Sequence, residues 1–355
     1  MKLFLAGATG AIGRYAVPAL VAAGHEVTGV ARSDAKAAWL RGRGASPVSV
    51  SIFDRAQLAE AVAGHEAVVN MATRIPPTSE ARKAASWVEN SRIRREGSAA
   101  LVDAALAAGI GRYVQESITF TYPDRGDAWI DEEVPTDVPE SLSTTADAEA
   151  SARRFTEAGA VGVVLRFGAL YGPGSEQTDM MLGLARRHVG TALGSPGGYI
   201  SQLHLADAGG AVVAALGVPA GTYNVVDDEP VTKRAQARLV GEAVGVRPWI
   251  VVPGRLGRFV GGPADTLSRS QRVSNAKLRA TGWAPRYPTV REGLAATIAA
   301  QAGADAGAAG RGTAATEQPG TAGPGTAGTD HPGAAGAAGR GAGSTTAAAG
   351  EHARG

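Results

Sequence analysis

The chain has 355 residues with a formal net charge of +2, contains no cysteine, and is only 5% aromatic. The lack of cysteine excludes disulfide bonds, thiolate catalysis and cysteine-ligated zinc. The charge is nearly balanced and no basic run is interleaved with aromatic residues, which argues against nucleic-acid binding. The six histidines follow no metal-binding spacing, so we expect no metal site.

The last 55 residues differ in composition from the rest of the chain. From Gln301 onwards there are 18 Ala and 15 Gly, and no Leu, Ile, Val, Phe, Trp, Tyr or Met. Such a segment buries too little apolar area to offset the entropy lost on ordering. We therefore predict a disordered, low-complexity tail over residues 301–355 and a folded body before it.

No segment of the sequence predicts a membrane partner. The apolar run before Gly7 is short for a signal peptide and breaks at a glycine-rich turn. No apolar stretch approaches the roughly 18 residues that a membrane-spanning helix needs. We expect a cytoplasmic protein.

Short β-branched runs alternate with alanine-rich segments of helical period along the first half of the chain. This alternation predicts an α/β fold, with a Rossmann-type doubly wound parallel sheet over residues 1–170. A small C-terminal substrate lobe over residues 171–300, interleaved with the core, is expected to follow. The expected strands are Lys2–Ala6, Glu26–Ala31, Pro47–Ser51, Ala67–Met71, Arg112–Glu116 and Val161–Phe167. The expected helices are Ala11–Ala23, Asp34–Arg43, Arg55–Ala63, Ser86–Ala108, Ala146–Ala158, Leu205–Leu216 and Thr232–Val244.

A glycine-rich motif connects the first expected strand to the first helix. It reads Gly7-Ala8-Thr9-Gly10-Ala11-Ile12-Gly13. The first glycine permits the tight turn, the second lets the backbone approach a pyrophosphate, and the third lets helix and strand pack closely. The helix N-terminus then faces the phosphates. We predict a dinucleotide site that includes Gly7, Thr9, Gly10, Ile12 and Gly13.

The end of the second strand indicates which dinucleotide binds. An acidic residue there accepts hydrogen bonds from the adenosine ribose of NAD, but this chain has Arg32 instead. A guanidinium can clamp a 2′-phosphate, which favours NADP over NAD. The alternative is an exposed arginine at a strand end.

Two further strand ends are candidates for cofactor contact. Asp54 follows the third strand, where its carboxylate can accept from the adenine amino group or can cap the next helix. Met71, Ala72 and Thr73 close the fourth strand, where small residues let the ribose and phosphates pass.

These motifs together resemble the extended branch of the short-chain dehydrogenase/reductase superfamily, which contains NAD-dependent epimerases, dehydratases and reductases. The likeness runs from Met1 to about Ala300. Besides the glycine motif it rests on three later segments. They are Arg166-Phe167-Gly168-Ala169-Leu170-Tyr171-Gly172-Pro173-Gly174, His204-Leu205-Ala206-Asp207 and Tyr223-Asn224-Val225. The resemblance implies the fold and the cofactor class, but it does not specify a substrate.

The resemblance fails at the catalytic pair of the family. Its members transfer a proton through a tyrosine, and a lysine four residues later lowers the pKa of that tyrosine. Here the corresponding places are occupied by Ser141 and Thr145. A serine hydroxyl without a neighbouring cation cannot replace that acid.

The segment after the fifth strand is the remaining candidate for catalysis. The carboxyl ends of the strands line the ligand crevice of a doubly wound sheet. We expect Ser117 or Thr119 to hydrogen-bond the substrate and Tyr122 to serve as a relocated proton donor. The alternative is that Ser117 and Thr119 satisfy backbone groups while Tyr122 packs in the interior.

Glu116 lies at the same depth and would be costly to bury alone. We predict that it pairs with an arginine from the neighbouring helix, namely Arg92, Arg94 or Arg95.

Two functions remain open at this stage. The first is an oxidoreductase or an epimerase/dehydratase-like enzyme that uses NADP, or alternatively NAD, and acts on a small carbonyl, alcohol or sugar-derived substrate. The second is a non-catalytic protein that binds NADP(H) as a sensor or holds a ligand. The resemblance also implies a homodimer formed through helices 86–108 and 146–158.

Overall fold

The central strands are apolar along nearly their whole length because helices cover both faces of the sheet. Strands β1 (Lys2–Ala6) and β4 (Ala67–Asn70) are buried at almost every residue. The structure is a computed structural model, in which residues 1–77, 79–81, 83–191, 194–247, 250–252 and 263–314 are described. Residues Met1–Gly307 form one compact unit.

Seven parallel strands form the sheet. Their spatial order is β12 (Gly221–Val225), β7 (Val161–Phe167), β5 (Arg112–Ile118), β4, β1, β2 (Glu26–Val30) and β3 (Ser46–Val48). The strand order reverses between β1 and β4, and this reversal opens a crevice at the carboxyl ends of the two strands. The predicted doubly wound α/β fold is confirmed.

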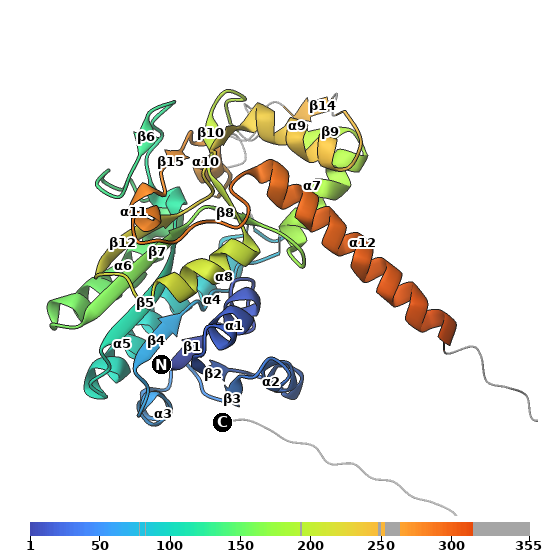
Figure 1. Ribbon diagram of the computed structural model, residues 1–355. Coiled ribbons are helices and arrows are strands. Elements are labelled where there is room, and N and C mark those ends of the chain that lie inside the picture. The colour runs from blue at the N-terminus through green and yellow to red at the C-terminus, as the bar shows by residue number, and fades with distance from the viewer. Residues whose placement is uncertain (78, 82, 192–193, 248–249, 253–262, 315–355) are drawn as a thin grey trace, which may run out of the picture. The chain divides into compact units, whose positions relative to one another are not determined.

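An apolar core lies on each face of this sheet. Helices cover both faces (Figure 1). Helices α1 (Gly13–Ala22), α2 (Asp34–Arg41) and α8 (Leu205–Ala214) contribute to the core on one face. Helices α3 (Arg55–Val62), α5 (Ser98–Ala107) and α6 (Ser143–Glu157) contribute to the core on the other face. Because the side chains of a strand alternate between faces, Leu5 belongs to the first core and Phe4 to the second.

The expected helix over residues 86–108 is irregular. It comprises a 3₁₀ turn η1 (Ala84–Trp87), helix α4 (Val88–Arg92), a π segment η2 (Ile93–Gly97) and then α5. Gly97 packs so closely that a Cβ there would lie 2.7 Å from Cδ1 of Ile52. π segments recur at functional sites because they re-aim side chains, and here the segment contains the buried Arg94.

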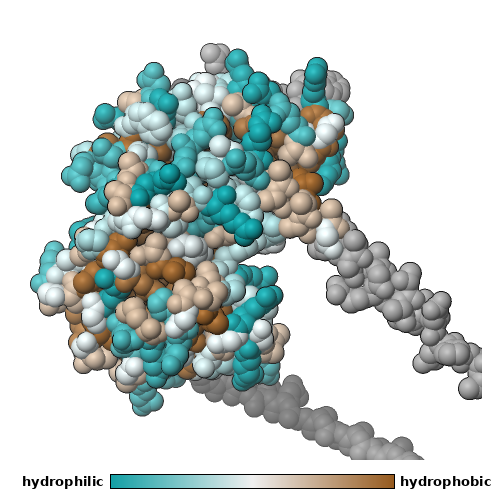
Figure 2. Space-filling model, viewed as in Figure 1, coloured by the Kyte–Doolittle hydropathy of each residue, from teal (hydrophilic) through white to brown (hydrophobic). Residues whose placement is uncertain are grey.

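Short elements that follow β5 in the chain lie around the ends of the strands. They are β6 (Trp129–Ile130), β8 (Ala169–Tyr171), α7 (Glu176–Arg186), β9 (Val189–Thr191), β10 (Tyr199–Ile200), β11 (Gln202–His204), β13 (Val231–Thr232), α9 (Lys233–Ala243), β14 (Ile250–Val252), α10 (Pro263–Ser268), β15 (Arg272–Val273) and α11 (Ala276–Arg279). Figure 2 shows that the upper part of this face, formed by these elements, is mostly hydrophilic. Apolar residues gather on its lower part, over the region of the seven-stranded sheet.

Helix α12 (Val290–Ala314) continues past residue 301, where we predicted the disordered tail to begin. Alanine has the highest helix propensity, so an alanine-rich segment can prolong a helix that a packed core has started. The part of the predicted tail after residue 314 lies outside the described residues.

A buried carboxylic acid follows β12. Asp227 is 1% exposed, and neither of its side-chain oxygens has a hydrogen-bond partner among the described residues. Burial, reinforced by nearby carboxylates, raises the pKa of Asp227 to about 8. The folded protein therefore holds this group protonated at neutral pH.

We predict that Asp227→Asn stabilises the protein at alkaline pH. Folding raises the pKa of Asp227. The contribution of Asp227 to the free energy of unfolding is therefore complete below its unfolded pKa near 4, and it is lost as the pH rises to about 8. The amide resembles the protonated acid and does not titrate. The difference between the melting temperatures of variant and wild type should grow from pH 5 to pH 8.5, and a constant difference would contradict the prediction.

Candidate cofactor and substrate site

The glycine motif forms a tight turn at the carboxyl end of β1. Gly7 has φ +79°, and a Cβ on it would lie 2.3 Å from the Met71 carbonyl oxygen. A Cβ on Gly13 would lie 2.2 Å from the Gly7 carbonyl oxygen. Gly7 therefore requires glycine for its turn conformation and Gly13 for close packing, as the motif predicted, and Gly7 is closely packed as well. A Cβ on Gly10 would approach only the Gly7 carbonyl oxygen, at 3.2 Å. Gly10 instead lines a cavity.

A buried polar network fixes the neighbouring turn after β4. The side-chain amide of Asn70 donates to Ser98 Oγ, Tyr113 Oη and Gln115 Oε1 at 3.1–3.3 Å, and its Oδ1 accepts from the Ala72 amide at 3.1 Å. The network holds the Met71–Thr73 turn against the glycine loop. The residues named from the sequence at these two strand ends are therefore brought together.

The first cavity, of about 390 Å³, opens between these two turns and the end of β2. Gly7, Thr9, Gly10, Met71, Ala72 and Thr73 line it, together with Arg32 and Lys36. Ser33 caps α2 by accepting from the Lys36 amide, which fixes the first turn of that helix beside Arg32. Lys36 was not predicted from the sequence, although it lies one helical turn from a capping serine. Two cations, Arg32 and Lys36, thus line the cavity near the end of β2.

Asp54 adopts the helix-capping alternative. Its Oδ1 accepts from the amides of Ala56 and Gln57, both at 3.1 Å, at the start of α3. The preceding Ile52 and Phe53 line the first cavity. Contact between Asp54 and adenine stays a prediction.

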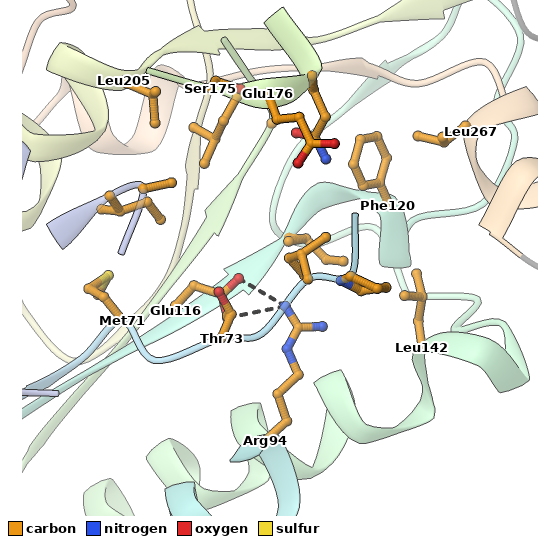
Figure 3. Close-up of a pocket in the computed structure, with 18 of the residues that line it drawn as sticks. Met71, Thr73, Arg94, Glu116, Phe120, Leu142, Ser175, Glu176, Leu205 and Leu267 are labelled. Atoms are coloured by element: carbon orange, nitrogen blue, oxygen red, sulfur yellow. Dashed lines mark hydrogen bonds and ion pairs between the residues drawn. The ribbon is translucent and has the colours of Figure 1, made fainter. Parts of the chain in front are cut away.

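A second cavity, also of about 390 Å³, adjoins the first and shares Met71 and Thr73 with it. Its lining is mostly apolar and includes two aromatic residues, Trp87 and Phe120 (Figure 3). Ile12 of the glycine motif lines this second cavity and not the first. No tyrosine, lysine or histidine occurs in its described lining.

The charged residues in this lining are Arg94, Glu116 and Glu176. Arg94 Nη2 donates to both Glu116 oxygens, at 2.9 and 3.1 Å, and the side chains are 2% and 6% exposed (Figure 3). The predicted pairing of Glu116 with a neighbouring arginine is confirmed. Arg94 Nη1 also donates to Thr145 Oγ1 at 2.5 Å. The residue in the place of the family's lysine is therefore bound to an arginine from the π segment.

We predicted that Ser117 or Thr119 contacts the substrate, but neither residue lines the cavity. Successive residues of a strand point to opposite faces, so Glu116 and Ile118 of β5 face the cavity. Phe120 also lines it, from the 3₁₀ turn Thr119–Thr121 that follows the strand. Ser117 points the other way, where its hydroxyl donates to Glu149 Oε1 at 2.6 Å. The prediction identified the right segment but the wrong face of it.

Tyr122 packs in the interior, which was the alternative to its predicted role as a relocated proton donor. It is 0% exposed and does not line the cavity. Its hydroxyl donates to Asn224 Oδ1 at 2.9 Å and accepts from Arg166 Nη1 at 2.8 Å. Burial raises the pKa of Tyr122, while Arg166 opposes that shift. The segment folds inward after Phe120, which sequence spacing alone did not reveal.

Ser141, in the place of the family's tyrosine, is exposed and does not line the cavity. The next residue, Leu142, does line it. The apolar side chain of Leu142 therefore lines the cavity where the family has its catalytic tyrosine.

Residues 7–208 match the family model described as NAD(P)H-binding. The chain is 34% identical over 313 residues to a Streptomyces protein named 3-diazoavenalumate denitrifying reductase, covering 83% of this chain and 99% of that one. This chain belongs to the NAD(P)H-binding family of extended, atypical short-chain dehydrogenases/reductases. It is an NAD(P)-dependent enzyme of the reductase and epimerase type.

Two solved structures illustrate the range of the likeness. The human epimerase family protein SDR39U1, crystallised with NADPH, has 26% identity and a TM-score of 0.69, covering 84% of this chain and 99% of that one. UDP-glucose 4-epimerase from Thermus thermophilus, in complex with NAD, has 22% identity and a TM-score of 0.67, covering 86% and 100%. The second likeness shows the fold alone.

The described residues contain neither a membrane-spanning helix nor a metal-binding cluster. No helix among them is long and apolar enough to cross a membrane. Nor does that part of the chain contain a group of three or more His, Asp or Glu side chains placed to hold a metal ion.

We predict that Tyr122→Phe lowers stability and leaves turnover within about twofold of wild type. Removing the hydroxyl leaves buried groups of Arg166 and Asn224 without a partner, at a cost of about 1–3 kcal/mol. Thermal unfolding and NADPH oxidation measure the two effects. Tyr223→Phe, which loses a hydrogen bond to the Pro219 carbonyl, is the matched control. A hundredfold loss of turnover at an unchanged melting temperature would restore Tyr122 as a proton donor.

Proposed function

We propose that this protein is an NADPH-dependent reductase of an aromatic substrate whose reduction requires no proton from the protein. The observation that carries the proposal is the second cavity. It adjoins the dinucleotide cavity, it is mostly apolar, and its described lining holds no tyrosine, lysine or histidine.

The residues of the first cavity fit NADPH. The glycine turn leaves room for a pyrophosphate at Gly10, and Arg32 and Lys36 supply two cations for a 2′-phosphate. The similar human protein was crystallised with NADPH. When bound, the reduced cofactor supplies a hydride to a substrate in the neighbouring cavity.

The walls of the second cavity favour a substrate with a flat, apolar ring. Phe120 and Trp87 offer ring faces, and Leu142, Leu170 and Leu205 exclude water from the space between them. Met71 lies where the two cavities meet and positions the substrate next to the cofactor.

The Arg94–Glu116 pair supports reduction without an acid. Both oxygens of Glu116 already accept hydrogen bonds from Arg94, so this carboxyl group is engaged in the pair and not free to serve a substrate. Thr145 is also held by Arg94. Carbonyl reduction needs a proton for the developing alkoxide, and general acids contribute about 10²–10⁴-fold to such steps. A substrate that is itself cationic avoids that need.

The similar Streptomyces reductase suggests such a substrate, because its name specifies a diazo compound and denitrification. We propose an arenediazonium or related diazo arene for this chain. Hydride transfer to the terminal nitrogen gives an aryl diazene, which loses N₂ as its hydrogen passes to the ring carbon. The C–N bond breaks, a C–H bond forms, NADPH is oxidised to NADP⁺, and no further proton is consumed.

The test is NADPH oxidation with a benzenediazonium salt and, separately, with benzaldehyde. We expect one N₂ released for each NADPH consumed. Reduction of benzaldehyde should be at least about 100-fold slower, because no tyrosine, lysine or histidine in the described lining can donate the proton. Gly10→Ala is the control: it adds one methyl group inside the dinucleotide cavity and should abolish the enzymatic rate.

Comparable turnover of benzaldehyde would contradict the acid-free mechanism. Tight NADPH binding without turnover of either compound would favour the non-catalytic function, which the missing tyrosine and lysine left open.

We predict that Arg32→Ala weakens NADPH about ten- to a hundredfold and changes NADH affinity by less than about twofold. A charge-assisted contact with a 2′-phosphate contributes about 1.5–3 kcal/mol. Titration calorimetry with both cofactors measures the change. Arg14→Ala, which removes a nearby cation that does not line the dinucleotide cavity, is the control. Equal weakening of both cofactors by Arg32→Ala would show that Arg32 does not recognise the phosphate.

A further inference from the structure

The second cavity contains a buried hydroxyl without a partner. Thr266 is 4% exposed and lines the cavity, and its Oγ1 makes no hydrogen bond to any described residue. Buried hydroxyl groups are normally hydrogen-bonded, because leaving one unpaired costs about 1–3 kcal/mol. A ligand in the cavity can supply the missing partner.

Lys233 holds the backbone beside this threonine. It is 2% exposed, and its Nζ donates to the carbonyls of Leu267, Ser268 and Arg269 at 2.8, 2.7 and 2.9 Å. The last carbonyls of a helix lack intrahelical donors, so the ammonium group caps the C-terminal end of α10. Three bonds from one group fix the position of the segment that follows Thr266.

Other contacts secure the same segment from two sides. Arg269 Nη1 donates to the Tyr122 and Asp137 carbonyls at 2.8 and 2.7 Å. Gly194 packs so closely that a Cβ there would lie 2.2 Å from the Ser268 carbonyl oxygen. The Thr266 hydroxyl is thus presented by a backbone that is already held in place, which lowers the entropic cost of binding a ligand.

The position of the segment indicates which part of a substrate it meets. Met71 lies where the second cavity joins the dinucleotide cavity. In Figure 3, Leu267 lies beyond Phe120 on the side away from Met71. The Thr266 segment therefore faces the end of the substrate that is remote from the hydride donor.

We propose that Thr266 is a specificity-determining residue that hydrogen-bonds a hydroxyl substituent on the remote end of an aromatic substrate, and that Lys233 is its positioning residue. The inference rests on the proposed function in that it takes the second cavity as the aromatic substrate site. It adds a substrate class, namely ring-hydroxylated arenes.

The test measures binding without turnover. Protein loaded with NADP⁺, which has no hydride to give, is titrated with benzaldehyde and with 2-, 3- and 4-hydroxybenzaldehyde by calorimetry. We expect one hydroxy isomer to bind about five- to tenfold more tightly than benzaldehyde, the range for one net hydrogen bond. Thr266→Val should abolish this preference without changing benzaldehyde affinity, whereas Thr266→Ser should keep it.

Lys233→Met provides a second variant. It removes the three carbonyl contacts and should reduce the hydroxyl preference while NADP⁺ affinity stays unchanged, because Lys233 does not line the dinucleotide cavity. If that variant does not fold, the two Thr266 variants still decide the question.

The proposal is overturned if no isomer binds more tightly than benzaldehyde, or if Thr266→Val retains the preference. These outcomes differ from failure of the proposed function. If a hydroxyl preference is found but no diazonium salt is reduced, the proposed reductase function is wrong and the proposed role of Thr266 is retained. Failure of every aromatic probe to bind would count against the aromatic cavity itself and against this inference with it.

Discussion

Two buried guanidinium–carboxylate pairs govern the end of strand β5. On the cavity face, Glu116 is bound by Arg94, and on the opposite face Ser117 donates to Glu149, which is bound by Arg166. Removing one member of a buried pair costs about 3–5 kcal/mol because it leaves an uncompensated charge. The two pairs thus set which side chains of β5 and α6 are available to a ligand and which are not.

Helix α6 contacts the arginine of both pairs, and these contacts explain how the site differs from that of its family. Thr145 and Glu149 lie one helical turn apart, so the first meets Arg94 and the second meets Arg166. Thr145, in the place of the family's catalytic lysine, therefore binds Arg94, and Arg94 in turn binds the Glu116 carboxylate. The substrate cavity is left with apolar walls, a neutralised ion pair and an exposed carboxylate, Glu176, at the start of α7.

The C-terminal half of the chain completes the cavity from the other side. Thr266 and Leu267 reach it from α10, and Leu205 reaches it from the start of α8. Each of these segments is anchored by contacts with residues distant in sequence, such as Lys233 for α10. The two cavities thus draw on different parts of the chain, since the described lining of the dinucleotide cavity comes from the first hundred residues.

The sequence by itself determined the fold and the dinucleotide turn, because these depend on local patterns. Alternation of apolar strands and helices predicted the sheet, and the spacing of Gly7, Gly10 and Gly13 predicted a turn that the structure forms at that place. The pairing of Glu116 with an arginine also followed from the cost of burying a lone charge. It needed no knowledge of the surrounding geometry.

The tertiary structure alone decided which side chains face the substrate. A shift of one residue along β5 exchanges Ser117 for Glu116 in the cavity, and no local signal fixed that register. The inward fold after Phe120 buried Tyr122 against Arg166 and Asn224, which are 44 and 102 residues away in the chain. Thr266 enters the cavity only because long-range contacts hold α10 there. Residues separated by tens of positions or more carry no sequence periodicity that relates them, so only the folded chain shows that they meet.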